Sequence, residues 1–301
     1  MKCTMPWRLR TRTLELGART LLMGVVNITP DSFSDGGAFF DRGAAVIHGL
    51  KLLDEGADLL DLGAESTRPG AHAGGSDPAV SAGEEIERLL PVLEGLLMAR
   101  PAAVISVDTY KAETARAAIA AGAEIVNDVS GLAWDRGLAQ VCAETGAGVV
   151  LAHTRGRPDE WWGQPRLAGD ALLALVRAGL THSLAAARAA GIAAEAVVLD
   201  PGYGFGKRLD ENYTLLARQA ELLELGRPLL AGLSRKSFLG HTLAPLNGGE
   251  PAPASARDAA SLAAMTAAIL NGASIVRVHA VRPAVEAARI ADAILQAPLM
   301  V

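Results

Sequence analysis

The chain has 301 residues, of which half are hydrophobic and only 20% are charged, so it can bury a large core. Its net charge of −5 and the lack of a long basic run argue against a nucleic-acid-binding surface. No apolar stretch approaches the roughly 20 residues of a membrane span, and the basic N-terminus lacks the apolar core of a signal peptide. Cys3 and Cys142 have neither disulfide nor metal-site spacing. We therefore expect a soluble cytoplasmic protein with two free thiols.

Short apolar runs alternate with Ala- and Leu-rich amphipathic stretches along the chain. The apolar runs, which predict buried parallel strands, lie within 21–27, 58–68, 102–109, 124–128, 148–153, 196–202, 228–236 and 273–279. The amphipathic stretches, which predict helices, cover 43–57, 81–99, 111–123, 136–147, 169–191, 212–226, 261–273 and 282–297. Ser81 is placed to cap the second of these helices.

Roughly eight strands alternating with roughly eight helices predict a (β/α)8 TIM barrel. We expect a single domain over 1–301, with a short N-terminal extension over 1–20. An open doubly wound sheet is the alternative, but no GxGxxG follows the first predicted strand. The Pro/Gly/Ala-rich segment 241–258, after the seventh strand, predicts a loop.

Polar residues stand at the ends of the apolar runs. They are Asn27, Asp61, Glu65, Arg68, Asp108, Asn127, Asp128, His153, Asp200, Lys236, Arg277 and His279. In a closed parallel barrel the active site gathers at the carboxyl ends of the strands. The pattern therefore predicts one ring of functional groups drawn from the whole chain.

Two groups within this ring suggest a ligand. Two carboxylates, an amide and an ammonium, from Asp108, Asn127, Asp200 and Lys236, suit a flat heterocycle with an amino-oxo edge. They do not resemble zinc ligands, because a buried zinc site favours His or Cys. The simpler interpretation of any one of them is a residue that caps the following helix.

The second group is Asn27, Arg277 and His279, which come from the first and last strands, and these strands are neighbours in a closed barrel. Arg and His donate to phosphate oxygens, and an Asn oxygen can hold a hydrated Mg²⁺ that also binds phosphate. The alternative is a salt bridge at the edge of the core for Arg277 and a buried, satisfied His279.

Three other segments have less certain roles. The glycine-rich loops after the first two strands, 26–37 and 63–71, can order over a ligand, or they are ordinary surface connections. The segment GYGFGKR at 202–208 looks like a phosphate loop but lacks the P-loop spacing. Trp161 and Trp162 lie in a predicted loop, as a packing lid or a partner surface.

Several of these segments together resemble the dihydropteroate synthase family of pterin-binding enzymes. The resemblance spans about 21–294 and is carried by MGVVNITPDSFSDGG (23–37), DLGAESTRPGA (61–71), SVDTYK (106–111), NDVSG (127–131), LDPGYGFGK (199–207), LSRKSFLG (233–240) and RVHAV (277–281). It implies a (β/α)8 barrel, usually a homodimer, that joins 6-hydroxymethyl-7,8-dihydropterin pyrophosphate to p-aminobenzoate and releases pyrophosphate with the help of Mg²⁺.

The resemblance also implies roles for individual residues. The pterin pocket would consist of Asp61, Asp108, Asn127, Asp200 and Lys236, and the pyrophosphate site of Asn27, Arg277 and His279, with Asn27 holding Mg²⁺. The p-aminobenzoate site would consist of Phe33, Thr67, Pro69 and Ser237. Direct catalytic roles would fall to Asp35, Arg68, Lys236, Arg277 and His279.

The chain departs from the family pattern at a few positions. Ala280 stands where the family usually has Asp, and Ala152-His153-Thr154 stands where it commonly has Met-His-Met. Two alternatives to a synthase are kept, the first because of these departures and the second because such barrels share the fold and the pterin-binding carboxylates. One is a catalytically weak pterin-binding paralogue, and the other is a barrel of the kind that binds methyltetrahydrofolate in methyltransferases.

Overall fold

Eight parallel strands close on themselves to form a barrel in the computed structural model, which describes residues 4–28, 42–66, 71–74 and 80–297. The strands follow one another around the barrel in chain order, and the last pairs with the first. They are β3 (Leu21–Asn27), β4 (Leu59–Gly63), β5 (Ile105–Asp108), β6 (Ile125–Asp128), β7 (Gly148–Ala152), β8 (Val197–Asp200), β9 (Leu229–Ala231) and β10 (Ala273–Val278). The predicted (β/α)8 barrel is confirmed, and the doubly wound alternative is wrong.

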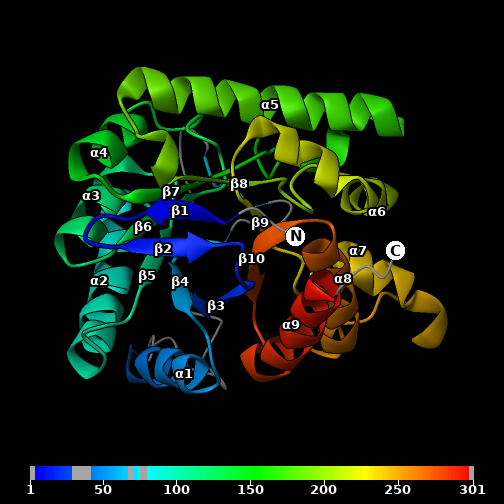
Figure 1. Cartoon of the computed structure of the whole chain (residues 1–301), viewed down its shortest axis with the longest axis horizontal. Helices are drawn as coiled ribbons and strands as arrows, with labels where there is room; N and C mark the ends of the chain where they lie inside the picture. The colour runs from blue at the N-terminus through cyan, green and yellow to red at the C-terminus, as the bar shows by residue number, and fades with distance from the viewer. Residues whose placement is uncertain (1–3, 29–41, 67–70, 75–79, 298–301) are drawn as a thin grey trace.

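Helices surround the barrel (Figure 1). Within the described residues the α-helices are α1 (Arg42–Asp54), α2 (Ala82–Ala99), α3 (Ala112–Ala120), α4 (Leu138–Thr145), α5 (Gly169–Ala190), α6 (Leu209–Ala217), α7 (Ser237–Thr242), α8 (Asp258–Leu270) and α9 (Val281–Gln296). Ser81 caps α2 as predicted, because its side chain accepts a hydrogen bond from the Glu84 N–H. None of these helices is long and apolar enough to cross a membrane.

The segment predicted as a loop over 241–258 contains short helical structure. α7 continues to Thr242, and 3-10 turns follow at Ala244–Leu246 and Ala254–Ala256. Three further 3-10 segments, Trp161–Gly163, Ala194–Ala196 and Gln219–Leu225, connect other elements. Short Pro- and Ala-containing turns of this kind leave little periodic signal in a sequence, which explains the difference.

Alternation along each strand separates two environments. On β4, Leu60 and Leu62 point outward into the core beneath the helices, whereas Leu59 points into the barrel. By the same alternation Asp61 points into the barrel, two positions nearer the carboxyl end. The interior is therefore apolar near the amino ends of the strands and becomes polar toward the carboxyl ends.

A β-hairpin that the sequence analysis did not predict covers the amino end of the barrel. Strand β1 (Met5–Arg8) pairs antiparallel with β2 (Thr13–Leu16), and the hairpin lies across the barrel end that faces the viewer in Figure 1. Trp7 and Leu16 pack into the same cluster as the inward side chains of the barrel, and Trp7 Nε1 donates to the Ala196 carbonyl at 3.0 Å. Burial of such a side chain contributes about 1.5–3 kcal/mol. The hairpin thus extends the core, and the polar end of the barrel lies opposite it.

Candidate active site

Asp61 is the centre of a hydrogen-bonded cluster at the carboxyl ends of the strands. Its Oδ2 atom accepts from Asn127 Nδ2 at 2.9 Å and from Arg277 Nε at 2.6 Å. A second nitrogen of the same guanidinium, Nη2 of Arg277, donates to Asp108 Oδ2 at 2.9 Å. Four strands, β4, β5, β6 and β10, therefore contribute one residue each to a single network.

The network contains more carboxylates than cationic groups. One guanidinium serves two carboxylates, and Asp61 is fully buried while its Oδ1 atom has no hydrogen-bond partner within the described residues. A buried acceptor without a donor is costly in free energy. The cluster is therefore suited to receive further N–H donors or cationic groups from a ligand.

Asp200 and Lys236 face the same space from the other side of the barrel. The Asp200 carboxylate is buried, and its Oδ1 atom accepts from the Gly202 N–H at 2.7 Å. A side chain at Gly232 would lie 3.8 Å from Asp200 Oδ2 and 4.0 Å from Arg277 Cβ, so the glycine keeps the space between these residues free of side chains. The Nζ atom of Lys236 stands 3.8 Å from the centre of the Phe205 ring, which is close enough for a cation–π interaction.

Two of these groups titrate near neutral pH. Burial raises the pKa of Asp108 to about 7, even though Arg277 opposes the shift and Asp61 adds to it. Burial also lowers the pKa of Lys236 to about 8, against the opposing charge of Asp200. Burial raises the pKa of Asp200 in the same way. Perturbed carboxyl and amino groups gathered in one place are typical of functional sites.

His279 is held differently from the rest of the cluster. Its Nδ1 atom lies 2.9 Å from Ser234 Oγ, and its main-chain N–H donates to the same oxygen at 3.3 Å. Burial lowers the pKa of His279 to about 3, and the positive charge of Arg277 adds to the shift. The imidazole is therefore neutral at physiological pH, and it can offer a ligand a hydrogen bond but no positive charge.

Comparison with known proteins agrees with this geometry. The family model described as "Pterin binding enzyme" matches residues 23–279. The dihydropteroate synthase of Escherichia coli strain K12 is 43% identical over 276 residues, which cover 92% of each chain. The chain belongs to the family of pterin-binding enzymes.

Solved structures of the family superpose closely. The Yersinia pestis dihydropteroate synthase in complex with a sulfonamide drug has a TM-score of 0.86 and 40% identity, covering 97% of this chain and all of that one. The Xanthomonas albilineans dihydropteroate synthase with 4-aminobenzoic acid has a TM-score of 0.85 and 42% identity, covering 98% of this chain and all of the other. The fold and the family resemblance inferred from the motifs are thereby confirmed.

Two members of the predicted anion-binding trio, Asn27 and Arg277, stand at different register positions of neighbouring strands. Strands β10 and β3 are neighbours as expected, but Arg277 pairs in register with Met23, whereas Asn27 pairs with Gly63 of β4. The hydrogen bonds of Arg277 go to Asp61 and Asp108, as described above. The joint role of Asn27, Arg277 and His279 stays a prediction.

The remaining predicted site residues fall into two groups. Ser237 is the first residue of α7 and is exposed, directly after Lys236. Five residues lie outside the described part of the chain: Phe33, Asp35, Thr67, Arg68 and Pro69. Their assignments stay predictions of the family resemblance.

Three polar residues at strand ends do not join the inward-facing ring, which corrects the simple expectation from the sequence. Asp128 turns outward and accepts from the N–H groups of Ser130 and Leu132. The His153 ring packs against α5, where a side chain at Gly179 would come within 2.5 Å of His153 Cδ2. Successive side chains along a strand point to opposite faces. Asp128 and His153 each stand next to an inward-facing residue, so both point outward.

Glu65 is the third residue, and it belongs to a separate buried ion cluster. The Lys111 ammonium lies 2.7 Å from Glu65 Oε2 and 3.0 Å from Glu85 Oε2. Thr114 Oγ1 donates to the same Glu85 oxygen at 2.8 Å. The cluster connects the start of the loop after β4 with α2 and with the beginning of α3.

Two residues beside the site were missed by the sequence analysis. Phe205 lies within the GYGFGK segment, which had been examined only as a phosphate-loop candidate. Ser234 directly follows the last apolar residue after β9, and its hydroxyl binds His279. Its position next to Arg235 and Lys236 was the signal in the sequence, but a single serine does not by itself indicate a functional site.

The departures from the family pattern have different surroundings. Ala152 ends β7 and is paired in register with Asp200, so a small buried side chain stands beside that carboxylate. Ala280 precedes α9 and lines a small cavity together with Ser234 and Asp258. Only the first of the two positions therefore borders a residue of the predicted pterin pocket directly.

Proposed function

We propose that this chain is a dihydropteroate synthase, which joins 6-hydroxymethyl-7,8-dihydropterin pyrophosphate to p-aminobenzoate and releases pyrophosphate. The observation that carries the proposal is the hydrogen-bonded cluster of Asp61, Asp108, Asn127 and Arg277 at the mouth of the barrel, in which Asp61 and Asn127 are buried. The identity to dihydropteroate synthases over nearly the whole chain supports it.

The pterin ring would bind between the two sides of the cluster. Asp200 would accept from the ring N–H and the exocyclic amino group, because a carboxylate accepts two hydrogen bonds side by side. Lys236 would donate to the ring carbonyl group. Asp108 and Asn127 would complete the polar edge, and the unpartnered Oδ1 atom of Asp61 supports the need for an additional donor there.

Arg277 and His279 would bind the pyrophosphate. Arg277 provides the positive charge, and the neutral His279 imidazole provides a directed hydrogen bond. The two functions differ in kind, because charge attracts the leaving group whereas the imidazole only orients it.

The site also suits a magnesium ion bound to pyrophosphate. Within the described residues there is no group of three or more His, Cys, Asp or Glu side chains that could hold a metal ion without phosphate. A single amide oxygen from Asn27 fits Mg²⁺, which keeps several waters and prefers phosphate partners. When bound, Mg²⁺ would neutralise negative charge on the leaving group.

The reaction breaks the bond between the exocyclic methylene of the pterin and a pyrophosphate oxygen. The oxygen keeps the electron pair, and Arg277 would stabilise the growing negative charge. The amine of p-aminobenzoate then bonds to the methylene carbon and loses a proton. Asp61, Asp108 and Asp200 would surround the pterin, and their carboxylates would stabilise the cationic methylene that is left when pyrophosphate departs, which supports a dissociative order of events.

The other assignments that the family resemblance implies belong to the same proposal. Phe33, Thr67, Pro69 and Ser237 would bind p-aminobenzoate, and Asp35 and Arg68 would act directly in catalysis. We also propose a cytoplasmic homodimer with one domain over 1–301, in which the hairpin forms part of the barrel core.

A direct assay tests the proposal. Purified protein, Mg²⁺, the pterin pyrophosphate and labelled p-aminobenzoate should yield labelled dihydropteroate. Pterin binding without product would favour the catalytically weak paralogue. Tight binding of methyltetrahydrofolate without product would favour the methyltransferase-type barrel.

A further inference from the structure

The loop between Asp200 and α6 wraps around the ammonium group of a buried lysine. Lys207 Nζ donates to the carbonyl groups of Gly202 at 2.7 Å, His153 at 3.0 Å and Phe205 at 3.3 Å. The ammonium thus uses all three of its donors on main-chain oxygens. Burial lowers the pKa of Lys207 well below its ordinary value, so the position is costly for a lysine. Such a cost calls for a reason beyond filling space.

The three carbonyl groups belong to residues that frame the proposed pterin site. His153 follows β7, and its N–H donates to the Asp200 carbonyl at 3.0 Å. Gly202 donates to the Asp200 carboxylate, and Phe205 places its ring against Lys236. Lys207 therefore connects the main chain of His153 and Gly202, which both bind Asp200, with Phe205, whose ring contacts the Lys236 ammonium.

The loop can approach Lys207 and Lys236 this closely only with glycine at two positions. Gly202 has a φ of +72°, and a side chain there would lie 1.8 Å from the His153 carbonyl oxygen. Gly204 has a φ of +79°, and a side chain there would lie 3.1 Å from Lys236 Cδ. Both the backbone conformation and the contacts favour glycine, so the loop is built for close approach.

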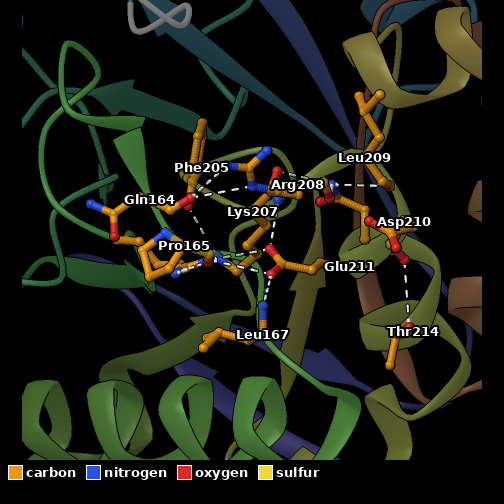
Figure 2. A network of polar contacts seen from close by, with 12 residues as sticks. Gln164, Pro165, Leu167, Phe205, Lys207, Arg208, Leu209, Asp210, Glu211 and Thr214 are labelled. Carbon is orange, nitrogen blue, oxygen red and sulfur yellow. Dashed lines mark hydrogen bonds and ion pairs between the residues drawn. The ribbon is translucent and has the colours of Figure 1, made fainter. Parts of the chain in front are cut away.

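An outer set of contacts holds the loop from the other side (Figure 2). Glu211 Oε2 accepts from Arg155 Nη1 at 3.1 Å and from the Arg208 N–H at 2.6 Å, and Glu211 Oε1 accepts from the Leu167 N–H at 2.7 Å. Arg155 and Glu211 are both buried. The loops after β7 and β8 are thus joined by hydrogen bonds to Glu211.

We infer that Lys207 is a positioning residue of the pterin pocket, which fixes the Asp200 carboxylate and the Phe205 ring relative to Lys236 through its three carbonyl contacts. The inference rests on the proposed function, because it takes the ligand to be a pterin. Lys207 touches neither the proposed ligand nor the reacting atoms, so it acts through Asp200, Phe205 and Lys236.

The test replaces Lys207 with methionine, which keeps the length of the side chain but cannot donate hydrogen bonds. The Kd for 6-hydroxymethylpterin, which carries no pyrophosphate, should rise at least about tenfold, as when supporting residues around a binding site are removed. The matched control is Lys51→Met, since Lys51 is exposed on α1 and pairs with Glu55, just beyond the end of that helix. That variant should bind the pterin like the unaltered protein.

A second readout needs no substrate. Acetylation of Lys236 by acetic anhydride, followed by mass spectrometry between pH 6 and 11, should have a midpoint near the pKa of about 8 in the unaltered protein. Asp200, Asp108 and Arg277, whose charges act on Lys236, remain in Lys207→Met, but the charge of Lys207, which repels Lys236, is lost. Gly202→Ala keeps every charge and displaces the His153 carbonyl group that Lys207 binds, so a midpoint that rose in Lys207→Met alone would be a charge effect and would overturn the inference. Loosening of the loop should admit water, and the midpoint should rise toward the ordinary value of 10.5.

A purely structural role for Lys207 predicts a different result. The melting temperature would fall, but the folded protein would keep both its pterin Kd and its Lys236 midpoint, and this outcome would overturn the inference. If Lys207→Met does not fold, Gly202→Ala disturbs the contact between Lys207 and the His153 carbonyl group without removing a charge or touching Lys236, and the same two changes are expected. If the unaltered protein binds no pterin, the proposed function fails, while the Lys236 midpoint still decides the role of Lys207.

Discussion

Arg277 Nε donates to Asp61 Oδ2 at 2.6 Å, although the two residues are 216 positions apart and their strands are not adjacent. Strand β3 lies between β10 and β4 in the barrel, so the contact passes across its carboxyl end. The long guanidinium side chain reaches over this strand and joins the last strand to the second strand of the barrel. Closure of the barrel, rather than any local sequence feature, creates the centre of the site.

Replacement of Arg277 with methionine should show which half of the proposed substrate, the pterin or the pyrophosphate, this residue binds. The variant should bind the pterin pyrophosphate more weakly by about 2–5 kcal/mol, the usual effect of truncating one partner of a buried charge pair. Binding of a pterin without pyrophosphate should decrease less, because it loses only the positioning of Asp61 and Asp108 by Arg277. Calorimetric titration of both ligands measures the difference, and equal losses would contradict the anion-binding role. Arg282→Met is a suitable control, because Arg282 is exposed and pairs with Glu286 on α9.

Asp200 offers a comparison between two substitutions. Asp200→Asn keeps an oxygen that can accept from the Gly202 N–H, whereas Asp200→Ala removes it. Both should weaken pterin binding by at least about 1–3 kcal/mol, because donors of the ring would be buried without partners. Only the alanine variant should also lower the thermal stability, because it loses the hydrogen bond that holds Gly202 and the loop after β8. Unchanged pterin affinity in Asp200→Asn would remove this residue from the pocket.

Pterin binding should depend on pH through Lys236. A lysine is cationic below its pKa, and burial lowers this pKa to about 8. Affinity for the pterin should therefore fall as the pH rises through 8, well before an ordinary lysine loses its proton, whereas a change near pH 7 would belong to Asp108. Isothermal titration between pH 6 and 9.5 follows this decline. Lys236→Met should bind weakly at every pH, and a decline that persisted in this variant would assign it to another group.

Lys111 should be important for stability. Its removal in Lys111→Met leaves the carboxylates of Glu65 and Glu85 buried without a cation, which costs about 3–5 kcal/mol. Urea denaturation at pH 7 should show the loss, whereas Lys51→Met, at an exposed ion pair, should lose less than about 1 kcal/mol.

The deficit of Lys111→Met should shrink as the pH falls. Burial already raises the pKa of Glu85, and Lys111 is the largest influence that opposes this shift. Without Lys111 the folded protein binds protons at this position more strongly than the unfolded chain, so acidification favours the folded state. A deficit that stayed constant between pH 7 and pH 5 would argue against unpaired carboxylates as its cause.

Much of the architecture was readable from periodicity alone. Continuous apolar runs identified the eight barrel strands, and the Ser81 cap and the Gly191 end of α5 follow from ordinary capping chemistry. The sequence analysis missed the hairpin because β1 and β2 have only four residues each, and each contains a charged side chain, Arg8 and Glu15. Such short strands become stable only when Trp7 and Leu16 are buried against the barrel, which is a tertiary contact.

The sequence by itself determined the fold class, the family and the set of polar residues that stand at the ends of the strands. Only the tertiary structure decided which of them form the site, because a shift of one position along a strand reverses the direction of a side chain. Asn127 therefore faces Asp61, whereas its neighbour Asp128 binds the following turn. Lys207 shows the same limit, since its three carbonyl partners come together only when the loops after β7 and β8 pack against each other.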